Sequence, residues 1–261
     1  GHAHEIINDI LDNRITVNSL TNRLQESLKI AKQLEEMANE RNIPIYEPFQ
    51  GDNIGHFHVL SPHPDWYNEL IKGFNNMPAS DKSTFIGEAV KSFKDKIKTV
   101  FENWNIETLS EDGETSDKNE SSAVLFGQLP NDLKVLLTAD AGLKSLDKSH
   151  EYALQNGVDL KVCDFIQMPH HGGRRNVSPT LLNKLIGPKL PEGSTLSKVA
   201  YVNTSKDCPE HPKKSVSNAF QRRGAKVIAT NGQTKCKHWG YPGRAGWVAV
   251  TPLPFFNQVE E

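Results

Sequence analysis

Two short strings near the middle of the chain carry residue types that bind metals or move protons. Asp140 ends an apolar run that covers residues 135–140, and the pair His170-His171 ends a second run that begins at Phe165. Such runs are typical of buried strands, and sites in open α/β sheets form outside the carboxyl ends of strands. Carboxylate and imidazole together form a ligand set for zinc, manganese or iron. These residues are too few for a complete metal site.

Each of these residues also has a structural explanation. Asp140 lies between two alanines, which would let a ligand approach closely, but an Asp after a strand is also a common helix N-cap. Adjacent His side chains cannot both face one point on a regular strand, so the chain must turn at His170-His171. In a functional interpretation one His binds a metal while the other contacts substrate or donates a proton. The alternative is a hydrogen-bonded surface turn.

Other residues with possible chemistry lie further along the chain. Arg174 and Arg175 could grip a phosphate, although exposed Arg pairs are usually solvated. His211 precedes a proline and a segment with helical apolar spacing, so it could act near a site or only mark a helix start. The run Lys235-Cys-Lys-His-Trp with Arg244 is a modest basic-aromatic patch, for which a surface loop is the simpler explanation.

Length and composition limit the class of protein. With 261 residues the chain can bury a substantial core, and 30 basic against 32 acidic side chains give a net charge of −2. No global basic field therefore indicates nucleic acid, although local patches remain open. Cys163, Cys208 and Cys236 show no CxxC spacing, so neither a disulfide framework nor a cysteine zinc site is indicated. Without a membrane span or signal peptide, we expect a cytoplasmic α/β protein.

The apolar spacing predicts the elements that must position these residues. From residue 120 onward strands and helices alternate, which is typical of a layered α/β sheet. An acidic exposed loop is expected over 110–119. The expected strands are 57–60, 122–126, 135–140, 165–170, 198–202 and 226–230, with a hairpin between the second and third and the series closed by the last. The expected helices are 19–40, 143–156, 180–186 and one after residue 212, and residues 65–104 form a polar, helix-prone region.

The order of several strings resembles the later part of metallo-β-lactamase-fold hydrolases, most of all the subgroup related to the hydrolase domain of DNA-uptake competence proteins. The strings are Asn119-Glu-Ser-Ser-Ala-Val-Leu, Leu136-Leu-Thr-Ala-Asp-Ala, Gln167-Met-Pro-His-His-Gly and His211-Pro. The resemblance covers about residues 43–230. It implies an αββα sandwich with metals at one edge between two sheets. We expect one domain over 1–261, with a linking segment and amphipathic helix in 1–42 and a sheet-and-helix body in 43–261.

The resemblance also implies roles for single residues. Asp140 would bridge two metal ions, Zn²⁺ or Mn²⁺, and His170 would be a further ligand, with His171 as the alternative. His171 or His211 would steady developing charge or the leaving group during metal-assisted hydrolysis. The subgroup favours a phosphodiester substrate, such as nucleic acid or a nucleotide, over a lactam. Arg174 and Arg175 would contact that substrate.

One departure from the family pattern concerns its main ligand motif, His-x-His/Asp-x-Asp-His. No Asp-His dipeptide occurs in the chain, and Ala139 and Gly173 replace the commoner Gly and Ser. We therefore expect a C-terminal portion that a missing N-terminal segment or a partner chain completes, and that alone is inactive and holds no tightly bound dinuclear centre. A variant that lost the motif and its catalysis is the other possibility.

Two hypotheses from other classes stay open. The chain could be a non-catalytic scaffold or partner-binding half that acts only when it is docked on an N-terminal half. It could also be a metal-independent phosphate or nucleotide binder that uses Arg174, Arg175 and His211. Metal content distinguishes both hypotheses from the hydrolase.

Overall fold

The structure is a computed structural model that describes residues 29–74 and 99–260. The chain divides into two compact units, one made of residues 1–48 and 63–96 and the other of residues 49–62 and 97–261. The single domain over residues 1–261 stays a prediction.

The described part of the first unit holds two helices, α3 (Lys29–Glu40) and α4 (Pro64–Phe74). Helix α4 starts with a proline in its first turn, where no backbone donor is lost, and buries Leu70, Ile71 and Phe74. The helix expected over 19–40 is confirmed over 29–40, and residues 19–28 lie outside the described residues. The helix-prone region expected over 65–104 is helical as far as residue 74, while 75–98 lie outside the described residues. The expectation is wrong over Thr99–Phe101, which forms a strand.

The second unit is built on a mixed sheet of seven strands. Its first pairings, from β1 to β5, are antiparallel, and the pairings from β5 to β8 are parallel. The expected hairpin between the second and third strands is confirmed as β4–β5. The chain therefore has an α/β fold. In spatial order the strands are β1 (Asn53–Ile54), β2 (Phe57–Ser61), β4 (Val124–Leu129), β5 (Leu133–Leu137), β6 (Phe165–Gln167), β7 (Lys198–Val202) and β8 (Ala225–Ala229).

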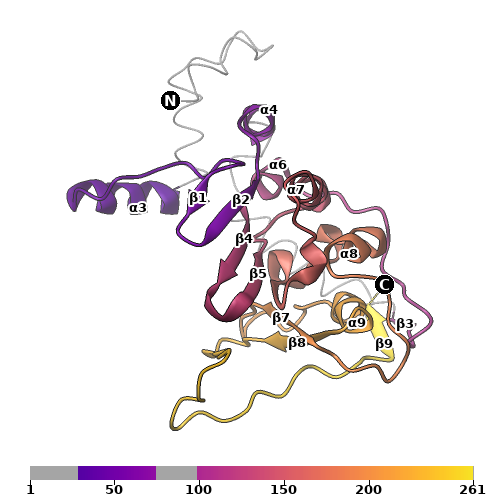
Figure 1. The fold of residues 1–261 in the computed structure, drawn as a ribbon. Coiled ribbons are helices and arrows are strands. Elements are labelled where there is room, and N and C mark those ends of the chain that lie inside the picture. The colour runs from indigo at the N-terminus through magenta and orange to yellow at the C-terminus, as the bar shows by residue number, and fades with distance from the viewer. Residues whose placement is uncertain (1–28, 75–98, 261) are drawn as a thin grey trace. The chain divides into compact units, whose positions relative to one another are not determined.

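Three helices cover one face of this sheet (Figure 1): α7 (Leu143–Gln155), α8 (Pro179–Leu185) and α9 (Lys214–Arg222). They agree with the helices expected at 143–156, 180–186 and after residue 212. Parallel strands need such crossovers, because a tight turn cannot return the chain to the same end of the sheet. A shorter helix, α6 (Asp117–Glu120), occupies the end of the segment that was expected to be an exposed loop.

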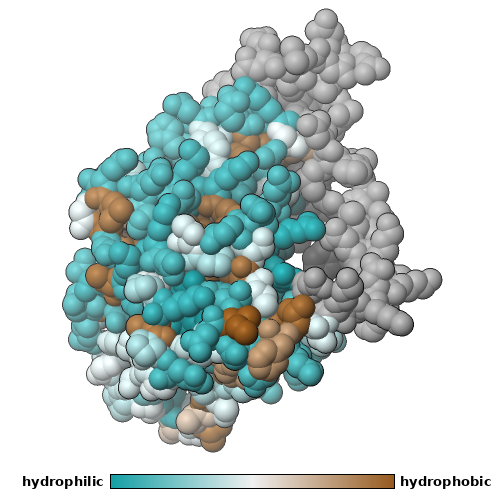
Figure 2. Space-filling view, turned by 90° about the vertical axis from the view of Figure 1, so that its right-hand side faces the viewer, coloured by the Kyte–Doolittle hydropathy of each residue, from teal (hydrophilic) through white to brown (hydrophobic). Residues whose placement is uncertain are grey.

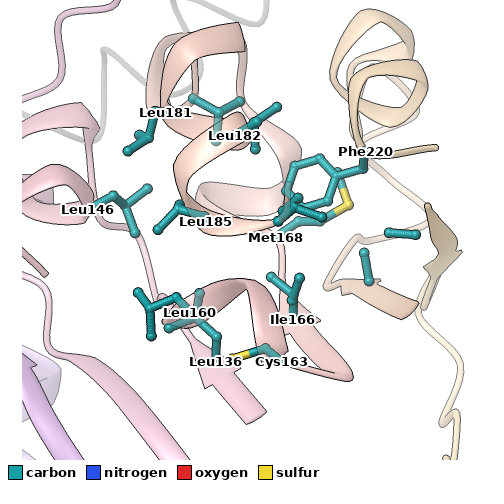
Figure 3. Packing of buried hydrophobic residues seen from close by; sticks show 14 of the residues in the cluster. Leu136, Leu146, Leu160, Cys163, Ile166, Met168, Leu181, Leu182, Leu185 and Phe220 are labelled. Atoms are coloured by element: carbon teal, nitrogen blue, oxygen red, sulfur yellow. The ribbon is translucent and has the colours of Figure 1, made fainter. Parts of the chain in front are cut away.

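The core lies between the sheet and these helices. Strand pairing places Leu136, Ile166, Ala200 and Val227 in one row across β5 to β8, all of them buried. Side chains from α8, Met168 and Phe220 of α9 meet over that row (Figure 3). Burying each large apolar side chain contributes about 1.5–3 kcal/mol, so this row anchors the strands whose ends carry the candidate site.

A two-stranded antiparallel sheet packs on the far side of α9. It pairs β3 (Thr99–Phe101) with β9 (Gln258–Glu260), two short segments that the sequence does not predict as strands. Strand β8 closes the seven-stranded sheet as expected, and β9 lies outside that series. Every residue of α9 from Ser215 to Arg222 is buried. Two ion pairs lock the layers, and we call them the arginine brace: Arg222 with Glu102 at 3.1 Å and Arg223 with Glu107 at 2.8 Å.

The other face of the seven-stranded sheet is less covered. By register, Leu125, Leu137, Phe165 and Tyr201 share this face, and each is partly exposed. Residues 236–252 enclose a cavity of about 490 Å³ against β7 and β8. On the side of the molecule drawn in Figure 2, hydrophilic residues dominate and hydrophobic ones form small separate patches. Among the residues described, no helix is both long and apolar enough to cross a membrane.

Candidate functional site at the carboxyl edge of the parallel strands

The segments that follow β5, β6, β7 and β8 meet at one edge of the sheet. The amide of His170 donates to the carbonyl oxygen of Ala139 at 3.0 Å, which ties the end of β6 to the end of β5. Thr204 and Asn231 join the ends of β7 and β8, because the Thr204 hydroxyl donates to the Asn231 side-chain oxygen at 2.9 Å. The parallel order of the strands thus collects the predicted residues at this edge.

Asp140 and His170 form the centre of this edge, and we call them the edge pair. The Nδ1 atom of His170 lies 3.5 Å from Oδ1 of Asp140, and both side chains are partly exposed. This distance suits an ion pair better than a hydrogen bond. The neighbouring His170 imidazole is the main reason why the pKa of Asp140 lies below its ordinary value, and it outweighs the opposing effect of partial burial. Asp140 is therefore ionised at neutral pH, with the His170 ring beside it.

The geometry of the edge pair fits two ligands of one metal ion. Ligands about 2.1 Å from zinc at a tetrahedral angle lie about 3.4 Å apart, close to the observed separation. The Nδ1 atom of His170 is also buried and makes no hydrogen bond within the described part of the chain. Among the residues that the structure describes, no third His, Cys, Asp or Glu joins the pair as a ligand group. Within those residues the site is incomplete.

The backbone around the edge pair is held in an unusual conformation. Ala139, His170 and His171 have positive φ angles of 45°, 44° and 55°, which non-glycine residues rarely adopt. The expected turn at the His pair is confirmed, and the Gly173 amide closes it by donating to the His170 carbonyl oxygen at 3.0 Å. Strained backbone of this kind is often found at ligand sites. The turn is thus hydrogen-bonded, and the metal-binding role of the His pair stays a prediction.

Two amide side chains hold the segment that carries Asp140. The Gln167 side-chain oxygen accepts hydrogen bonds from the amides of Thr138 and Ala139, both at 3.0 Å. Asn176 donates to the carbonyl oxygens of Asp140 and Ala141, both at 3.1 Å. The sequence did not single out these two residues, since an isolated Gln or Asn carries no spacing signal. Their role depends on distant backbone groups.

Asp140 is not the N-cap of the helix that follows it. The N-cap of α7 is Gly142, and the Glu120 carboxylate accepts from the Ser145 amide at 2.7 Å. A Cβ atom at Gly142 would lie 1.9 Å from the Thr115 hydroxyl oxygen and 2.1 Å from the Glu120 carboxylate. The helix start is thus satisfied by another carboxylate. The alternative in which Asp140 caps the helix is wrong, and its carboxylate is available to a ligand.

The second histidine of the pair, His171, forms a hydrogen bond with the residue that follows β7. Nδ1 of His171 lies 2.7 Å from the carbonyl oxygen of Asn203, so that ring nitrogen carries the proton in the bond. The other ring nitrogen, Nε2, takes no part in this bond, and the side chain is exposed. The rings of His170 and His171 are 5.8 Å apart between centroids. The structure therefore gives the two histidines different partners.

His211 is held beside the turn at residues 170–172. A Cβ atom at Gly172 would lie 2.6 Å from Cβ of Pro212, and the Lys213 amide donates to the Gly172 carbonyl oxygen at 3.2 Å. Burial is the main reason that the pKa of His211 lies below its ordinary value. The Lys213 ammonium lowers this pKa further, as do the two neighbouring histidines. His211 is therefore a neutral imidazole at pH 7.

The two arginines expected to contact substrate follow the same turn. Arg174 is partly buried and Arg175 is exposed in a short helical turn, Arg174–Asn176. Among the described residues neither guanidinium takes part in an ion pair. Their positions are compatible with phosphate binding, which stays a prediction.

Cys208 and Glu210 join His211 in a group that sequence reasoning missed. The Cys208 thiol donates to the Glu210 carboxylate at 3.0 Å, and the three ligand atoms lie within 4.8 Å of one another. A spacing rule for paired cysteines overlooks a site with a single cysteine. The string Cys-Pro-Glu-His, with three ligand types in four positions, is the signal that could have found it.

The basic-aromatic patch noted in the sequence borders the cavity against β7 and β8. The Lys237 ammonium lies 4.9 Å from the Trp239 ring centroid, and the Arg244 guanidinium lies 5.5 Å from that of Trp247. A second cavity of about 620 Å³ shares Trp247 and the three residues after it. Neither cavity is lined by an acidic residue among those described.

Comparisons with protein-family models, with curated proteins and with solved structures find no match for this chain.

Proposed function

We propose that the chain is part of a metal-dependent hydrolase that cleaves a phosphodiester, with its remaining metal ligands supplied from outside the described residues. The observation that carries the proposal is the edge pair, in which Asp140 and His170 lie at ligand-to-ligand distance and leave Nδ1 of His170 unsatisfied. A missing N-terminal segment or a partner chain would supply the other ligands. The partly exposed sheet face would then receive a second sheet and complete an αββα sandwich.

Different residues at this edge would bind the metal, transfer a proton and bind the phosphate. Asp140 and His170 would hold Zn²⁺ or Mn²⁺, which when bound lowers the pKa of a water ligand and polarises a phosphoryl oxygen. The His171 ring nitrogen that does not bond to Asn203 would take up a proton from solvent and deliver it to the leaving oxygen, because its other nitrogen is held at the Asn203 carbonyl oxygen. Arg174 and Arg175 would bind a phosphate oxygen.

Charge distribution supports nucleic acid as the source of the phosphodiester. No Asp or Glu occurs between Glu210 and Glu260, although the whole chain has a net charge of −2. Within this stretch the two adjoining cavities are lined by Lys226, Lys235, Lys237, Arg244 and Trp247. Basic grooves with aromatic side chains favour single-stranded nucleic acid, which supplies phosphates and stacking bases. Three free cysteines fit a cytoplasmic location.

The test uses the longest protein encoded by the reading frame that contains this chain. We expect it to include His-x-His/Asp-x-Asp-His upstream and to hydrolyse bis(p-nitrophenyl) phosphate and a single-stranded oligonucleotide with Zn²⁺ or Mn²⁺. Asp140→Asn and His170→Ala should each lower kcat/KM about 100- to 1000-fold, since a metal supplies several kcal/mol of transition-state stabilisation.

His58→Ala is the matched control, because His58 is an exposed histidine on β2 and should leave kcat/KM unchanged. Hydrolysis that survives both edge variants would show that the site assignment is wrong. A long protein that binds the oligonucleotide but never cleaves it would replace the hydrolase with a non-catalytic binding half.

A further inference from the structure

We propose that Cys208, Glu210 and His211 form a mononuclear zinc site, separate from the edge pair. The inference goes beyond the proposed function, because it concerns metal binding and does not require hydrolysis. In it His211 is a metal ligand instead of the group that steadies the leaving oxygen.

The chain folds these three residues together by a local turn. The His211 amide donates to the Cys208 carbonyl oxygen at 3.2 Å, which closes one turn over Cys-Pro-Glu-His and places the first and last side chains on one side. The ligand atoms already lie within 4.8 Å of one another. Zinc bonds of about 2.0–2.3 Å require ligand separations of about 3.3–3.7 Å, which rotations of the partly exposed side chains can reach.

The donor set selects zinc among the common metals. Thiolate and imidazole are ligands for soft and borderline ions, and carboxylate completes sets used by zinc. Calcium and magnesium prefer oxygen ligands only. With three protein ligands, the fourth position of a tetrahedral ion would be left to water or an anion, as in zinc sites that keep an open position.

Few other side-chain hydrogen bonds within the described part of the chain compete with a metal for the ligand atoms of the cluster. Nδ1 of His211 is buried and makes no hydrogen bond within the described part of the chain. The Cys208 thiol bonds only to Glu210 in that part, so both side chains can turn to a metal together. Burial, with the Glu210 carboxylate beside it, raises the pKa of Cys208 to about 11. Zinc binding would thus release the thiol proton to solvent and make affinity rise with pH.

The site lies on a loop with a fixed position. Pro212 packs on Gly172, and the Lys213 amide bonds to the Gly172 carbonyl oxygen, so the loop holds to the turn that carries His170 and His171. A metal in the cluster would therefore stiffen the connection between the ends of β6 and β7. Metal binding should therefore also raise the unfolding temperature of the chain.

The test is a Co²⁺ titration of the 261-residue chain, followed by its absorption spectrum. Cobalt replaces zinc in such sites and shows a thiolate-to-metal charge-transfer band when a cysteine is bound. We expect this band with one equivalent of Co²⁺ in the unchanged chain, and its loss in Cys208→Ser. Glu210→Gln and His211→Ala should weaken Zn²⁺ binding about 10-fold or more, since even residues that only orient ligands cost that much.

Cys236→Ser is the matched control, because Cys236 is another partly buried free thiol outside the cluster, and the band should persist in it. The double variant Asp140→Asn, His170→Ala should also keep the band, which separates this site from the proposed hydrolase. Circular dichroism would confirm that Cys208→Ser is folded. Absence of the band in the unchanged chain, its survival in Cys208→Ser, or its loss in the double variant would each overturn the proposal.

Discussion

The arginine brace and the edge pair each place a carboxylate beside a nitrogen-bearing side chain, but their surroundings are opposite. Arg222 and Glu102 are fully buried, and Arg222 also donates to the backbone carbonyls of Trp104, Asn103 and Ile106. The edge pair is partly exposed and leaves Nδ1 of His170 without a hydrogen bond within the described part of the chain. The brace uses its charges to join the end of α9 to the segment that follows β3. The edge pair leaves the Asp140 carboxylate and Nδ1 of His170 available for a ligand.

The two pairs differ in burial and in the number of their hydrogen bonds. The buried brace makes many, although Nη1 of Arg222 has no partner among the described residues, and the partly exposed edge pair makes few. A charge inside a protein persists only when hydrogen bonds replace its lost water. Glu102 meets this demand with Thr108, Asn218 and Arg222. Asp140 has less need of such bonds, because water reaches its carboxylate. Asn176 therefore holds its backbone, and His170 is the neighbour of the carboxylate. Substitutions in the brace should therefore lower stability strongly, whereas substitutions in the edge pair should lower ligand binding and change stability little.

Removing one partner of the brace should produce the largest loss of stability. Glu102→Ala leaves the Arg222 guanidinium buried without its counter-ion, and we expect a loss of about 3–5 kcal/mol in the free energy of unfolding. Urea denaturation measures it. Glu69→Ala, which removes an exposed ion pair with Lys72, should cost less than about 0.5 kcal/mol. Equal losses in the two variants would contradict the structural role of the brace.

Gly142→Ala should have the next largest effect. The added methyl group would overlap the Thr115 hydroxyl and the Glu120 carboxylate, both held in a hydrogen-bonded network, so we expect a loss of about 1–3 kcal/mol. Thermal unfolding detects the change. The control is Gly243→Ala, where the nearest atom, Nε2 of His238, would be 3.7 Å away. If the two substitutions are equally mild, the packing around the start of α7 is looser than the structure indicates.

Acid should weaken the brace more than the edge pair. Burial alone would raise the pKa of Glu107, but hydrogen bonds from Arg223 and Lys189 hold this pKa below its ordinary value. A carboxyl with a lowered folded pKa stabilises the fold above its unfolded pKa of about 4.3, and that stability is lost as the pH falls through the folded pKa.

Unfolding free energies between pH 7 and pH 3 would test this difference. The gap between the unchanged chain and Glu107→Gln should shrink on acidification, because acid removes the interaction that the variant lacks. Asp140→Asn should show a smaller pH-dependent gap, since water screens the partly exposed edge pair. A larger gap for Asp140→Asn would reverse the comparison.

His170→Ala should have the smallest effect on stability. Exposed ion pairs contribute about 0–1 kcal/mol, and Nδ1 of His170 has no hydrogen bond to lose among the described residues. Urea denaturation without added metal should therefore place this variant within about 1 kcal/mol of the unchanged chain. A loss as large as that of Glu102→Ala would mean that the edge pair is structural, and the proposed metal role would lose its support.

Much of the candidate site could be predicted because its elements are local. An apolar run followed by Asp140, and another followed by Pro169 and the His pair, determine two strand ends within a few residues. Parallel order then brings the ends together. The support from Gln167 and Asn176 could not be predicted, because it depends on which distant backbone groups lack partners.

The sequence alone determined the alternating strands and helices, the turn at His170-His171 and the residue types at the edge. Periodicity and turn chemistry act over a few neighbouring residues, so they are visible without a fold. Tertiary structure decided the brace, whose partners Glu102 and Arg222 are 120 positions apart, and the pairing of β3 with β9. It also decided that Glu120 contacts the start of α7 and leaves Asp140 available. Long-range contacts of this kind depend on how whole layers pack, which no local pattern encodes.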